Sequence, residues 1–502
     1  MLSLTSPAQA SQWLHERVTA ALHTDSRKVG AGDGFIAWPG AATDGRKFVQ
    51  SALDAGAAAC LVESQGANVF GFTDHRIACY DGLKAATGLV AADYYQQPSQ
   101  KLDVIAVTGT NGKTSTAWWV AQALNILYQS TPGSTAAACG LVGTLGTGIP
   151  GHMVFNGLTT PDPVLLQAEF SRMVSQGMRA CAVEASSIGL VEHRIAGTAI
   201  GTAVFTNLTQ DHLDYHGDMA SYWAAKKTLF DMAGLQTAVV NLDDDKGAIL
   251  AQHCAVQGIQ VWTTSQLRTD ARLWAKEVRY HDTGMQFTVC EATTQAHVDC
   301  QMIGEYNVSN LLGVVAVLRS LGFDLALCCK AVSQCSPVPG RMECISQADS
   351  PLVAVDFAHT PDALEKVLAA LRPLARARSG QLWCVFGCGG DRDASKRPRM
   401  AAAAERGADK LVITSDNPRT ESADSIIEQI VQGLASLSSA HIQVERAAAV
   451  AYAIGRARSN DVIVIAGKGH EDYQDIAGVK HPFSDVTQAK VALQLRAGDV
   501  TV

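Results

Sequence analysis

Short, mostly apolar runs recur along the middle of the chain and alternate with stretches in which apolar residues recur at helical spacing. The runs are Val104–Val107, Arg179–Val183, Thr202–Phe205 and Thr237–Asn241, and the first precedes a helical stretch at Ala117–Tyr128. Runs of about four apolar residues fit strands that are buried on both faces. The alternation predicts a mostly parallel sheet with crossover helices.

The two ends of the chain repeat this pattern. Near the N-terminus, short runs at Phe35–Trp38 and Ala59–Val62 lie on either side of a helical stretch at residues 47–56, which predicts a small α/β unit. Beyond Cys335–Arg341, a stretch with two prolines, helical segments separate further buried strands. These strands are expected at Leu352–Asp356, Leu382–Phe386, Lys410–Thr414 and Val462–Ala466. The pattern predicts a doubly wound, Rossmann-like sheet with ligands at the carboxyl ends of its strands.

The breaks between these regions suggest three domains. Gln96–Lys101 is polar and contains a proline, as expected of a linker. A chain of 502 residues is too long for one core, since domains average about 150 residues. We therefore expect an α/β protein with a small N-terminal domain (1–98), a central phosphate-loop ATPase domain (99–336) and a C-terminal Rossmann-like domain (337–502).

Composition narrows the class of protein. Hydrophobic residues make up 47% and charged residues 18%, as in a folded chain. The net charge of −8 argues against nucleic acid as the main partner, although a local pocket can still bind an anion. No basic flank precedes an apolar core at the N-terminus, and no apolar run approaches the length of a spanning helix, so we expect neither a signal peptide nor membrane insertion.

The cysteines also point to the cytoplasm. The 13 cysteines are scattered and odd in number, which does not fit a disulfide framework. Cys384 and Cys388 lack the spacing of a zinc knuckle, and no second pair follows them. We expect free, buried thiols in a reducing compartment.

A glycine loop at Thr108–Ser115 carries the first chemical signal. It lies between a buried strand and a helix, and its ligand-binding candidates are Gly109, Thr110, Asn111, Gly112, Lys113, Thr114 and Ser115. Glycines allow the backbone to approach phosphate, and the amides and helix N-terminus attract its charge. Lys113 can reach the terminal phosphates, and the Thr114 hydroxyl can bind Mg²⁺. Only two residues separate the glycines instead of four, and the loop alone does not specify the reaction.

Polar residues follow the next two strands at the same predicted edge. Glu184 follows one strand and His212 the other, and either side chain could bind a divalent cation. Each residue alone is more often a cap or a satisfied core histidine. Lys226 lies on a predicted helix, where a lysine is usually solvated, so physical reasoning alone does not single it out.

Motifs along nearly the whole chain resemble the Mur ligase family, which builds the peptide of bacterial peptidoglycan. The matching stretches are Gly109–Thr114, Glu184–Ser187, Asn207 with Asp211–Asp214, Ala225–Lys226, Tyr306–Asn307 with Asn310, Pro339–Glu343 and Asp356–Pro361. The resemblance implies an ATP-dependent ligase that phosphorylates a carboxylate, after which an amine attacks the acyl phosphate. This mechanism needs positive charge around the phosphate oxygens.

The resemblance also implies the catalytic residues. Lys113, Glu184, His212 and Lys226 form the catalytic set, in which Thr114, Glu184, His212 and carbamylated Lys226 hold Mg²⁺. A neutral lysine amine captures carbon dioxide, and the carbamate offers Mg²⁺ two oxygens. The expected nucleotide-binding residues further along the chain are Asn307, Arg341, Asp356 and His359, with Arg341 near the γ-phosphate.

The N-terminal motifs resemble the family members that add the third residue of the stem peptide. These motifs are Thr24–Arg27, Gly32–Asp33 and Asp44–Gly45, and Ser26 is expected to contact the uridine diphosphate. Thr159, Thr160, Ser186, Glu192 and Arg194 are expected to hold the muramoyl peptide. The family often has glutamine where this chain has Glu192. That departure puts a substrate contact by Glu192 in doubt, and we expect Glu192 to pair with a cation.

The C-terminal domain is expected to select the amino acid. By resemblance, Asp416–Arg419 is the version of its motif associated with meso-diaminopimelate, and lysine-adding relatives lack the arginine. The candidate ligands are Arg392, Asp416, Asn417, Pro418, Arg419, Gly467 and Glu471. Arginines suit the second carboxylate of diaminopimelate, and Glu471 with the Gly467 carbonyl suits its distal ammonium. Gly387–Gly390 lacks the third glycine of a dinucleotide-binding loop, which argues against a dehydrogenase.

These motifs predict an ATP- and Mg²⁺-dependent enzyme that adds meso-diaminopimelate to UDP-N-acetylmuramoyl-L-alanyl-D-glutamate. The alternatives are a lysine-adding enzyme, a folylpolyglutamate synthase-type ligase and a nucleotide switch. We expect a cytoplasmic monomer whose domains close on its three substrates, since closure protects a reactive acyl phosphate from water.

Overall fold

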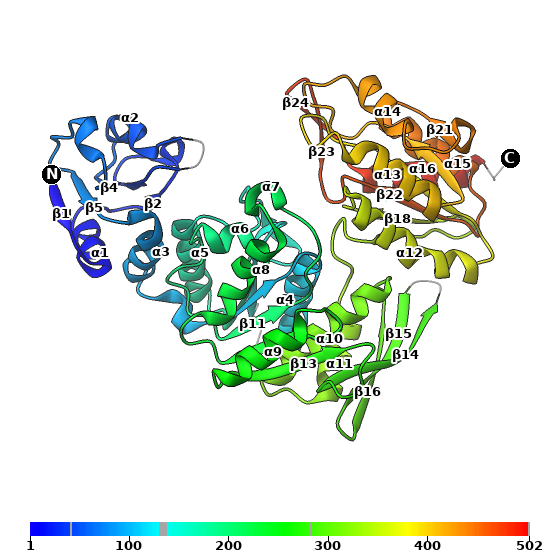
Figure 1. Ribbon diagram of the computed structural model, residues 1–502, viewed down its shortest axis with the longest axis horizontal. Helices are drawn as coiled ribbons and strands as arrows, with labels where there is room; N and C mark the ends of the chain where they lie inside the picture. The colour runs from blue at the N-terminus through cyan, green and yellow to red at the C-terminus, as the bar shows by residue number, and fades with distance from the viewer. Residues whose placement is uncertain (41–42, 130–137, 282–283, 500–502) are drawn as a thin grey trace. The chain divides into compact units, whose positions relative to one another are not determined.

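The computed structural model describes residues 1–40, 43–129, 138–281 and 284–499 (Figure 1). The chain divides into two compact units. The first contains Met1–Trp274, Glu291–Thr294 and Ser309–Ala331, and the second contains Ala275–Cys290, Gln295–Val308 and Val332–Val502. The two boundaries predicted between three domains are not tested by this division and stay predictions.

A five-stranded parallel sheet lies at the start of the first unit. Its order is β1-β5-β4-β3-β2. The strands are β1 (Leu2–Leu4), β2 (Leu22–His23), β3 (Gly34–Ala37), β4 (Ala59–Glu63) and β5 (Ile77–Tyr80), and the helices are α1 (Pro7–His15), α2 (Val49–Asp54) and α3 (Leu83–Tyr94). Side chains of β3 and β4 enter the core on alternate faces, as the pleat of a strand requires. This confirms the small N-terminal α/β unit.

The central sheet of the first unit has the order β13-β12-β11-β6-β10-β7-β8-β9. Its parallel strands are β6 (Asp103–Thr108), β7 (Cys139–Gly143), β10 (Ala180–Glu184), β11 (Thr202–Phe205), β12 (Thr237–Asn241) and β13 (Gln260–Ser265). All four strands predicted here are present. The antiparallel edge formed by β7, β8 (Gly146–Ile149) and β9 (His152–Val154) was not predicted.

Helices complete this region of the chain. They are α4 (Lys113–Gln129), α5 (Pro163–Ser175), α6 (Ser187–Val191), α7 (Leu213–His216), α8 (Met219–Lys227), α9 (Gly247–Val256), α10 (Glu305–Ser320) and α11 (Leu325–Ser333). The strand order continues from β13 through β14 (Leu273–His281), β15 (Gly284–Glu291) and β16 (Thr294–Cys300). These last three strands were not predicted either.

Strand β6 lies between β10 and β11, so the three loops that follow these strands meet at one edge. Glu184 pairs with Val107, and Phe205 pairs with Thr108. The glycine loop therefore starts beside the ends of the two strands that carry the predicted metal ligands. Ligands bind at such a crevice in open α/β sheets.

The C-terminal sheet of the second unit has the order β17-β18-β22-β19-β20-β21. Its strands are β17 (Glu343–Ile345), β18 (Leu352–Asp356), β19 (Leu382–Phe386), β20 (Lys410–Ile413), β21 (Ala440–Ile442) and β22 (Val462–Ala466), and only β17 runs antiparallel to its neighbour. One core packs α12 (Pro361–Ala377), α13 (Lys396–Gly407) and α14 (Ala423–Val431) against this sheet. Another packs α15 (Arg446–Arg456) and α16 (Asp485–Asp499) against it. Helices covering both faces confirm the doubly wound prediction.

A hairpin and the predicted linker complete the description. Strands β23 (Tyr473–Ile476) and β24 (Val479–Pro482) form a separate antiparallel pair that was not predicted. The predicted linker contains a 3-10 turn at Pro98–Lys101, and Ser99 is buried where its hydroxyl accepts a 3.0 Å hydrogen bond from the amide of Ala199. This linker is thus packed against the central region.

The cysteines occur as free thiols, all buried except the half-buried Cys344. This agrees with the sequence-based expectation, and burial raises the pKa of thiols such as Cys60 and Cys139 to about 12. In the described part of the chain, no helix has the length and apolar content to cross a bilayer.

Candidate active site

The glycine loop between β6 and α4 has a backbone that only glycine fits at two positions. Gly109 has φ +152° and Gly112 has φ +85°. A Cβ at Gly109 would collide with the hydroxyl of Thr206, and one at Gly112 with the side-chain oxygen of Asn310. Both glycines are therefore required for close packing as well as for backbone freedom.

The segment after β11 holds this loop in place. The amide of Asn111 donates to Oδ1 of Asn207 at 2.9 Å, and Nδ2 of Asn207 donates to the carbonyl of Asn111 at 3.0 Å. The amide of Thr110 donates to the carbonyl of Asn207 at 2.8 Å, and the hydroxyl of Thr206 donates to the carbonyl of Asn111 at 2.6 Å. These bonds fix the loop backbone independently of the Lys113 side chain.

Lys113 and Lys226 both donate to the carbonyl oxygen of Gly109, at 2.9 and 2.7 Å. Lys226 is only 1% exposed, and its Nζ lies 4.4 Å from the ring centre of Tyr222. Burial, reinforced by the charge of Lys113, lowers the pKa of Lys226 to about 6. Its amine is therefore largely neutral at pH 7.

Glu184 lies at the end of β10 beside the start of α4. Its Oε2 accepts hydrogen bonds from the hydroxyls of Thr114 at 2.8 Å and Thr144 at 3.2 Å, and its Oε1 accepts one from the amide of Thr144 at 2.7 Å. The carboxylate is almost fully buried. The structure thus joins the predicted ligands Thr114 and Glu184, while Thr144 was missed because nothing in its sequence marks it.

His212 lies apart from that pair. Its side chain is 43% exposed, and its Nε2 is 3.5 Å from Asp211. Its ring centre is 6.2 Å from that of Tyr222, whose ring also faces Lys226. Within residues 1–40, 43–129, 138–281 and 284–499, no three His, Cys, Asp or Glu side chains are grouped to hold a metal ion. The predicted metal ligands are therefore only partly assembled.

Several residues predicted to bind the muramoyl peptide gather next to Glu184. The hydroxyl of Thr160 donates to the carbonyl of Glu184 at 2.6 Å and lies 3.1 Å from the hydroxyl of Ser186. The guanidinium of Arg194 donates to the carbonyl of Thr160 at 3.1 Å. Thr159 lies 3.1 Å from Thr144, hydroxyl to hydroxyl. The structure therefore brings Thr159, Thr160, Ser186 and Arg194 together.

Ser26 and Glu192 occupy other places in the first unit. Ser26 begins a 3-10 turn at Ser26–Lys28 that is capped by Asp25. A hydrogen bond from Arg27 lowers the pKa of Asp25 to about 2. Glu192 pairs with Lys84 at 2.7 Å, which confirms the expectation that it would find a cation.

The nucleotide-binding candidates after residue 300 lie in the second unit. Asp356 is buried, and its two oxygens accept hydrogen bonds from the amides of Met342 at 2.7 Å and Ala358 at 2.8 Å. Burial raises the pKa of Asp356. Through these two hydrogen bonds, Asp356 orients two segments, one that carries Arg341 and one that carries His359. Nδ1 of His359 lies 2.8 Å from the carbonyl of Phe357.

Arg341 lies in a cluster of aromatic rings. Its guanidinium carbon is 4.7 Å from the ring centre of Phe357, which is 5.3 Å from that of His470. Burial and the charge of Arg341 lower the pKa of His470 to about 4. Among buried atoms of the described residues, Nε of Arg341 and Nδ1 of His470 have no hydrogen-bond partner. Asn307 donates to the carbonyl of Ile303 at 2.7 Å.

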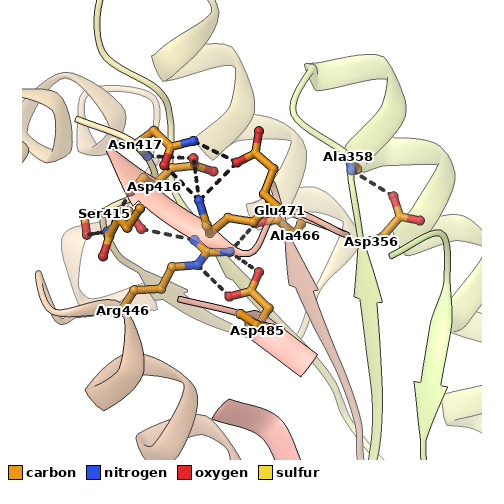
Figure 2. A network of polar contacts seen from close by, with 12 residues as sticks. Asp356, Ala358, Ser415, Asp416, Asn417, Arg446, Ala466, Glu471 and Asp485 are labelled. Carbon is orange, nitrogen blue, oxygen red and sulfur yellow. Dashed lines mark hydrogen bonds and ion pairs between the residues drawn. The ribbon is translucent and has the colours of Figure 1, made fainter. Parts of the chain in front are cut away.

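A buried lysine, Lys468, connects the residues of the predicted amino-acid site, of which Asp416, Asn417 and Glu471 are labelled in Figure 2. The ammonium of Lys468 is fully buried and donates to Oδ1 of Asn417 at 2.9 Å and Oε2 of Glu471 at 3.1 Å. It lies 4.0 Å from Oδ1 of Asp416. Nδ2 of Asn417 donates to the same Glu471 oxygen at 2.8 Å. Lys468 therefore joins two predicted motifs, Asp416–Arg419 and Gly467–Glu471.

A second buried cation lies beneath this pocket. Arg446 and Asp485 form a two-pronged ion pair, at 2.8 and 2.7 Å, in which both side chains are fully buried. Arg446 also donates to the carbonyls of Ser415 at 3.1 Å and Ala466 at 3.0 Å, as Figure 2 shows. Ala466 is the last residue of β22, and Ser415 lies two residues after the end of β20. The ion pair thus fixes the two strand ends from which the pocket loops begin.

The two arginines predicted to bind a carboxylate both approach the glycine turn after β19. Nη1 of Arg419 donates to the carbonyl of Gly390 at 2.7 Å. A Cβ built on Gly389 would lie 2.9 Å from Arg419 and 3.9 Å from Arg392. The backbone of Arg419, at φ +51°, exchanges hydrogen bonds with Asp475 and Ala477 of the β23–β24 hairpin. Pro418 is buried beside it.

Comparisons with known proteins settle the family. The profile of the Mur ligase middle domain matches residues 107–318, that of the Mur ligase glutamate ligase domain matches residues 340–469, and that of the Mur ligase family catalytic domain matches residues 19–89. The chain belongs to the Mur ligase family. This confirms the resemblance predicted from the motifs.

Individual relatives agree with this assignment. The chain is 55% identical over 498 residues, 99% of each chain, to a UDP-N-acetylmuramoyl-L-alanyl-D-glutamate–2,6-diaminopimelate ligase of Acidovorax sp.. It is 46% identical over 472 residues, 94% of each chain, to the ligase of that name from Pseudomonas aeruginosa. A solved structure with that name has 35% identity, covers 95% of each chain and superposes with a TM-score of 0.68. A Mycobacterium tuberculosis folylpolyglutamate synthase has 18% identity, covers 82% of this chain and 95% of its own, and shares the fold with a TM-score of 0.61.

Proposed function

We propose that this Mur ligase adds meso-2,6-diaminopimelate to the D-glutamate carboxylate of UDP-N-acetylmuramoyl-L-alanyl-D-glutamate, using ATP, in peptidoglycan synthesis. The full-length identity to relatives that carry this name is the observation on which the proposal rests most. Arg419 and Arg392 near the glycine turn after β19, and Glu471 bonded to Asn417, supply the charges that suit the substrate those names give. The folylpolyglutamate synthase is a more distant match that shares the fold alone.

ATP binding is assigned to Thr108–Ser115. The loop amides and the N-terminus of α4 attract phosphate, and Lys113, now bound to backbone carbonyls, can turn toward the terminal phosphates. The D-glutamate carboxylate attacks the γ-phosphorus, which yields an acyl phosphate and ADP. The amine of diaminopimelate then attacks the acyl carbon, forming the amide and releasing phosphate and a proton.

Mg²⁺ fits Thr114 and Glu184. The Thr114 hydroxyl and the Glu184 carboxylate are hard oxygen donors 2.8 Å apart, which is the chemistry that Mg²⁺ selects. Mg²⁺ supplies charge neutralisation for phosphoryl transfer when bound there. His212, which is exposed beside Asp211, is the third ligand that we assign.

We assign carbamylation to Lys226. The reaction joins the neutral amine to carbon dioxide with loss of a proton, and the lowered pKa of Lys226 makes this form available at neutral pH. The carbamate replaces a neutral amine with two oxygens that share one negative charge next to Gly109. These oxygens add negative charge at the phosphate loop, where it favours binding of a divalent cation.

The choice of amino acid follows from its second carboxylate. Arg419 and Arg392 can bind that group through paired hydrogen bonds. The hydrogen bonds to the Glu471 side chain from described residues end on Oε2, so we assign Oε1 to the distal ammonium. Lysine lacks the carboxylate and would leave these arginines without their partner, and a site left unpaired in this way rejects an analogue strongly.

The remaining assignments extend the family relationship. Ser26 is assigned to the uridine diphosphate, and Thr159, Thr160, Ser186 and Arg194 to the muramoyl peptide. Asn307, Arg341, Asp356 and His359 are assigned to the nucleotide. Arg341, whose buried Nε lacks a described partner, suits an anion. We further propose a cytoplasmic monomer, without nucleic acid as a partner, that closes on its substrates.

Phosphate release in the purified enzyme tests this proposal. We expect release only when ATP, the UDP-linked dipeptide and diaminopimelate are all present, together with a product heavier by one diaminopimelate residue. ATP binding without substrate-dependent release would instead support a nucleotide switch. Release with folate and glutamate, but not with the UDP-linked dipeptide, would support a folylpolyglutamate synthase-type ligase.

A further inference from the structure

One face of helix α3 packs directly against the segment that carries two substrate-binding candidates. Lys84, Gly88 and Ala92 are spaced four residues apart, so they share one face of the helix. Opposite them lies Glu192–Gly197, which includes Arg194. The side chains of Lys84 and Glu192 form an ion pair of 2.7 Å.

The glycines of this contact leave no room for a side chain. A Cβ on Gly88 would collide with the carbonyl of Ala196, and a Cβ on Gly197 would collide with the carbonyl of Gly88. The Cβ of Ala92 would lie 3.0 Å from that of a residue replacing Gly197. Helix α3 therefore approaches the segment Glu192–Gly197 as closely as two backbones can. The Lys84–Glu192 pair lies one helical turn from this contact.

Glu192 also connects this contact to the segment after His212. The hydroxyl of Tyr215, in α7, donates to Oε1 of Glu192 at 2.6 Å, while Lys84 pairs with Oε2. Although burial opposes it, the hydrogen bonds from Lys84 and Tyr215 hold the pKa of Glu192 below its ordinary value. Glu192 is thus a charged junction between α3, α6 and α7.

We infer that Lys84 is a positioning residue for the nucleotide-peptide substrate, and that it neutralises the glutamate at position 192. This inference rests on the proposed function. An unpaired carboxylate at this position would repel an anionic substrate and compete for Arg194, two residues away. By pairing with Glu192, Lys84 removes that repulsion and holds α3, from the N-terminal sheet region, against the segment beside Ser186.

Four variants test this role, each assayed for kcat and for the KM of all three substrates. They are Lys84→Met, Glu192→Gln, the double variant, and Lys101→Met as a matched control. Lys101 follows α3 in the chain and is exposed. Lys84 is 36% exposed, so its replacement leaves the core intact.

We expect Lys84→Met to raise the KM for the UDP-linked dipeptide about tenfold, which corresponds to about 1.4 kcal/mol, with the KM values for ATP and diaminopimelate unchanged. The double variant is expected to return to within about threefold of the wild type, since it removes the unpaired charge. Lys101→Met is expected to match the wild type.

Three results would overturn the inference. They are an unchanged KM in Lys84→Met, a double variant as impaired as Lys84→Met, and an equal rise in all three KM values. The wild-type enzyme separates this inference from the proposed function. If it shows no diaminopimelate-dependent turnover, the proposed function fails. If it does turn over, only the comparison of variants decides the role of Lys84.

Discussion

The glycine loop and the predicted amino-acid site are built in different ways. The loop is one continuous stretch, Thr108–Ser115, and is held largely by hydrogen bonds between its backbone and the segment after β11. The pocket joins side chains from separate segments, and its charges are balanced by Lys468 and by the Arg446–Asp485 pair. A site made by the backbone of one segment can be recognised in the sequence as a motif. In a site made by side chains from several segments, the pairing of the charges can be seen only in the folded structure.

The largest expected effect is at the phosphate-loop site. Glu184→Gln replaces a carboxylate oxygen with an amide nitrogen, which cannot accept the hydrogen bond from Thr114 or Thr144 and binds Mg²⁺ poorly. We expect kcat to fall about 10³-fold, as when one electrostatic contact to a transition state is lost. Phosphate-release kinetics measure this. Glu169→Gln, on helix α5, is the control and is expected to keep wild-type activity. A kcat of Glu184→Gln equal to that of the wild type would contradict the assignment.

The second prediction concerns the base of the pocket. Arg446→Met leaves Asp485 charged and buried, and we expect the free energy of unfolding of the C-terminal region to fall by about 3–5 kcal/mol. Urea denaturation measures the loss. Adding Asp485→Leu removes the orphaned charge and is expected to recover part of the stability. A double variant less stable than Arg446→Met would contradict this account, and Arg456→Met at the end of α15 is the control.

The third prediction separates binding from stability in the same pocket. Lys468→Met removes the ammonium that orients Asn417 and Glu471. We expect the KM for diaminopimelate to rise about 10- to 100-fold, which is the effect of losing one hydrogen bond to a charged group. The KM for ATP stays constant. Lys480→Met is a matched control, because Lys480 also faces the ring of Tyr473 but is exposed. An equal change in both lysine variants would refute the role of Lys468.

The fourth prediction uses the pKa of Lys226. The pKa of Lys226 in the folded protein is about 6, well below the usual lysine value. The fraction of Lys226 in the neutral amine form therefore rises roughly tenfold between pH 5 and pH 7. A carbamate signal from ¹³C-labelled bicarbonate is expected to grow over this range. Lys226→Met abolishes that signal, whereas Lys227→Met keeps it, because Lys227 is paired with Asp231 at the surface. No signal in the wild type at pH 7 would rule out the modification.

The fold was predictable where strands are buried on both faces. Thr202–Phe205, Leu352–Asp356 and Val462–Ala466 match observed strands because a continuous apolar run leaves few alternatives. Strands β8 and β9 were missed for different reasons: β8 is short and half glycine, so it has no apolar run, and β9 is short and largely exposed at the edge of the sheet. The β23–β24 hairpin is largely exposed as well, so it has no apolar run to mark it.

Candidate site residues could be predicted only where a motif is continuous. The sequence marks the glycine loop and Asp416–Arg419 as candidates, and the structure places Glu184 beside Thr114. Arg446 and Asp485 are separated by 39 residues and look like ordinary surface charges in the sequence, and only the packing of α15 against α16 brings them together. Lys468 lies inside a motif that the sequence marks, but its partner Asn417 comes from the loop after β20, which the sequence alone does not place beside it.

The most direct test of the central claim compares meso-diaminopimelate with L-lysine as the amine substrate. We predict that kcat/KM for diaminopimelate exceeds that for lysine by at least about 10³-fold, since lysine leaves the arginine side of the pocket unpaired. Arg419→Leu is expected to narrow this ratio mainly by lowering kcat/KM for diaminopimelate. Equal or faster turnover with lysine in the wild-type enzyme would contradict the proposed amino-acid specificity.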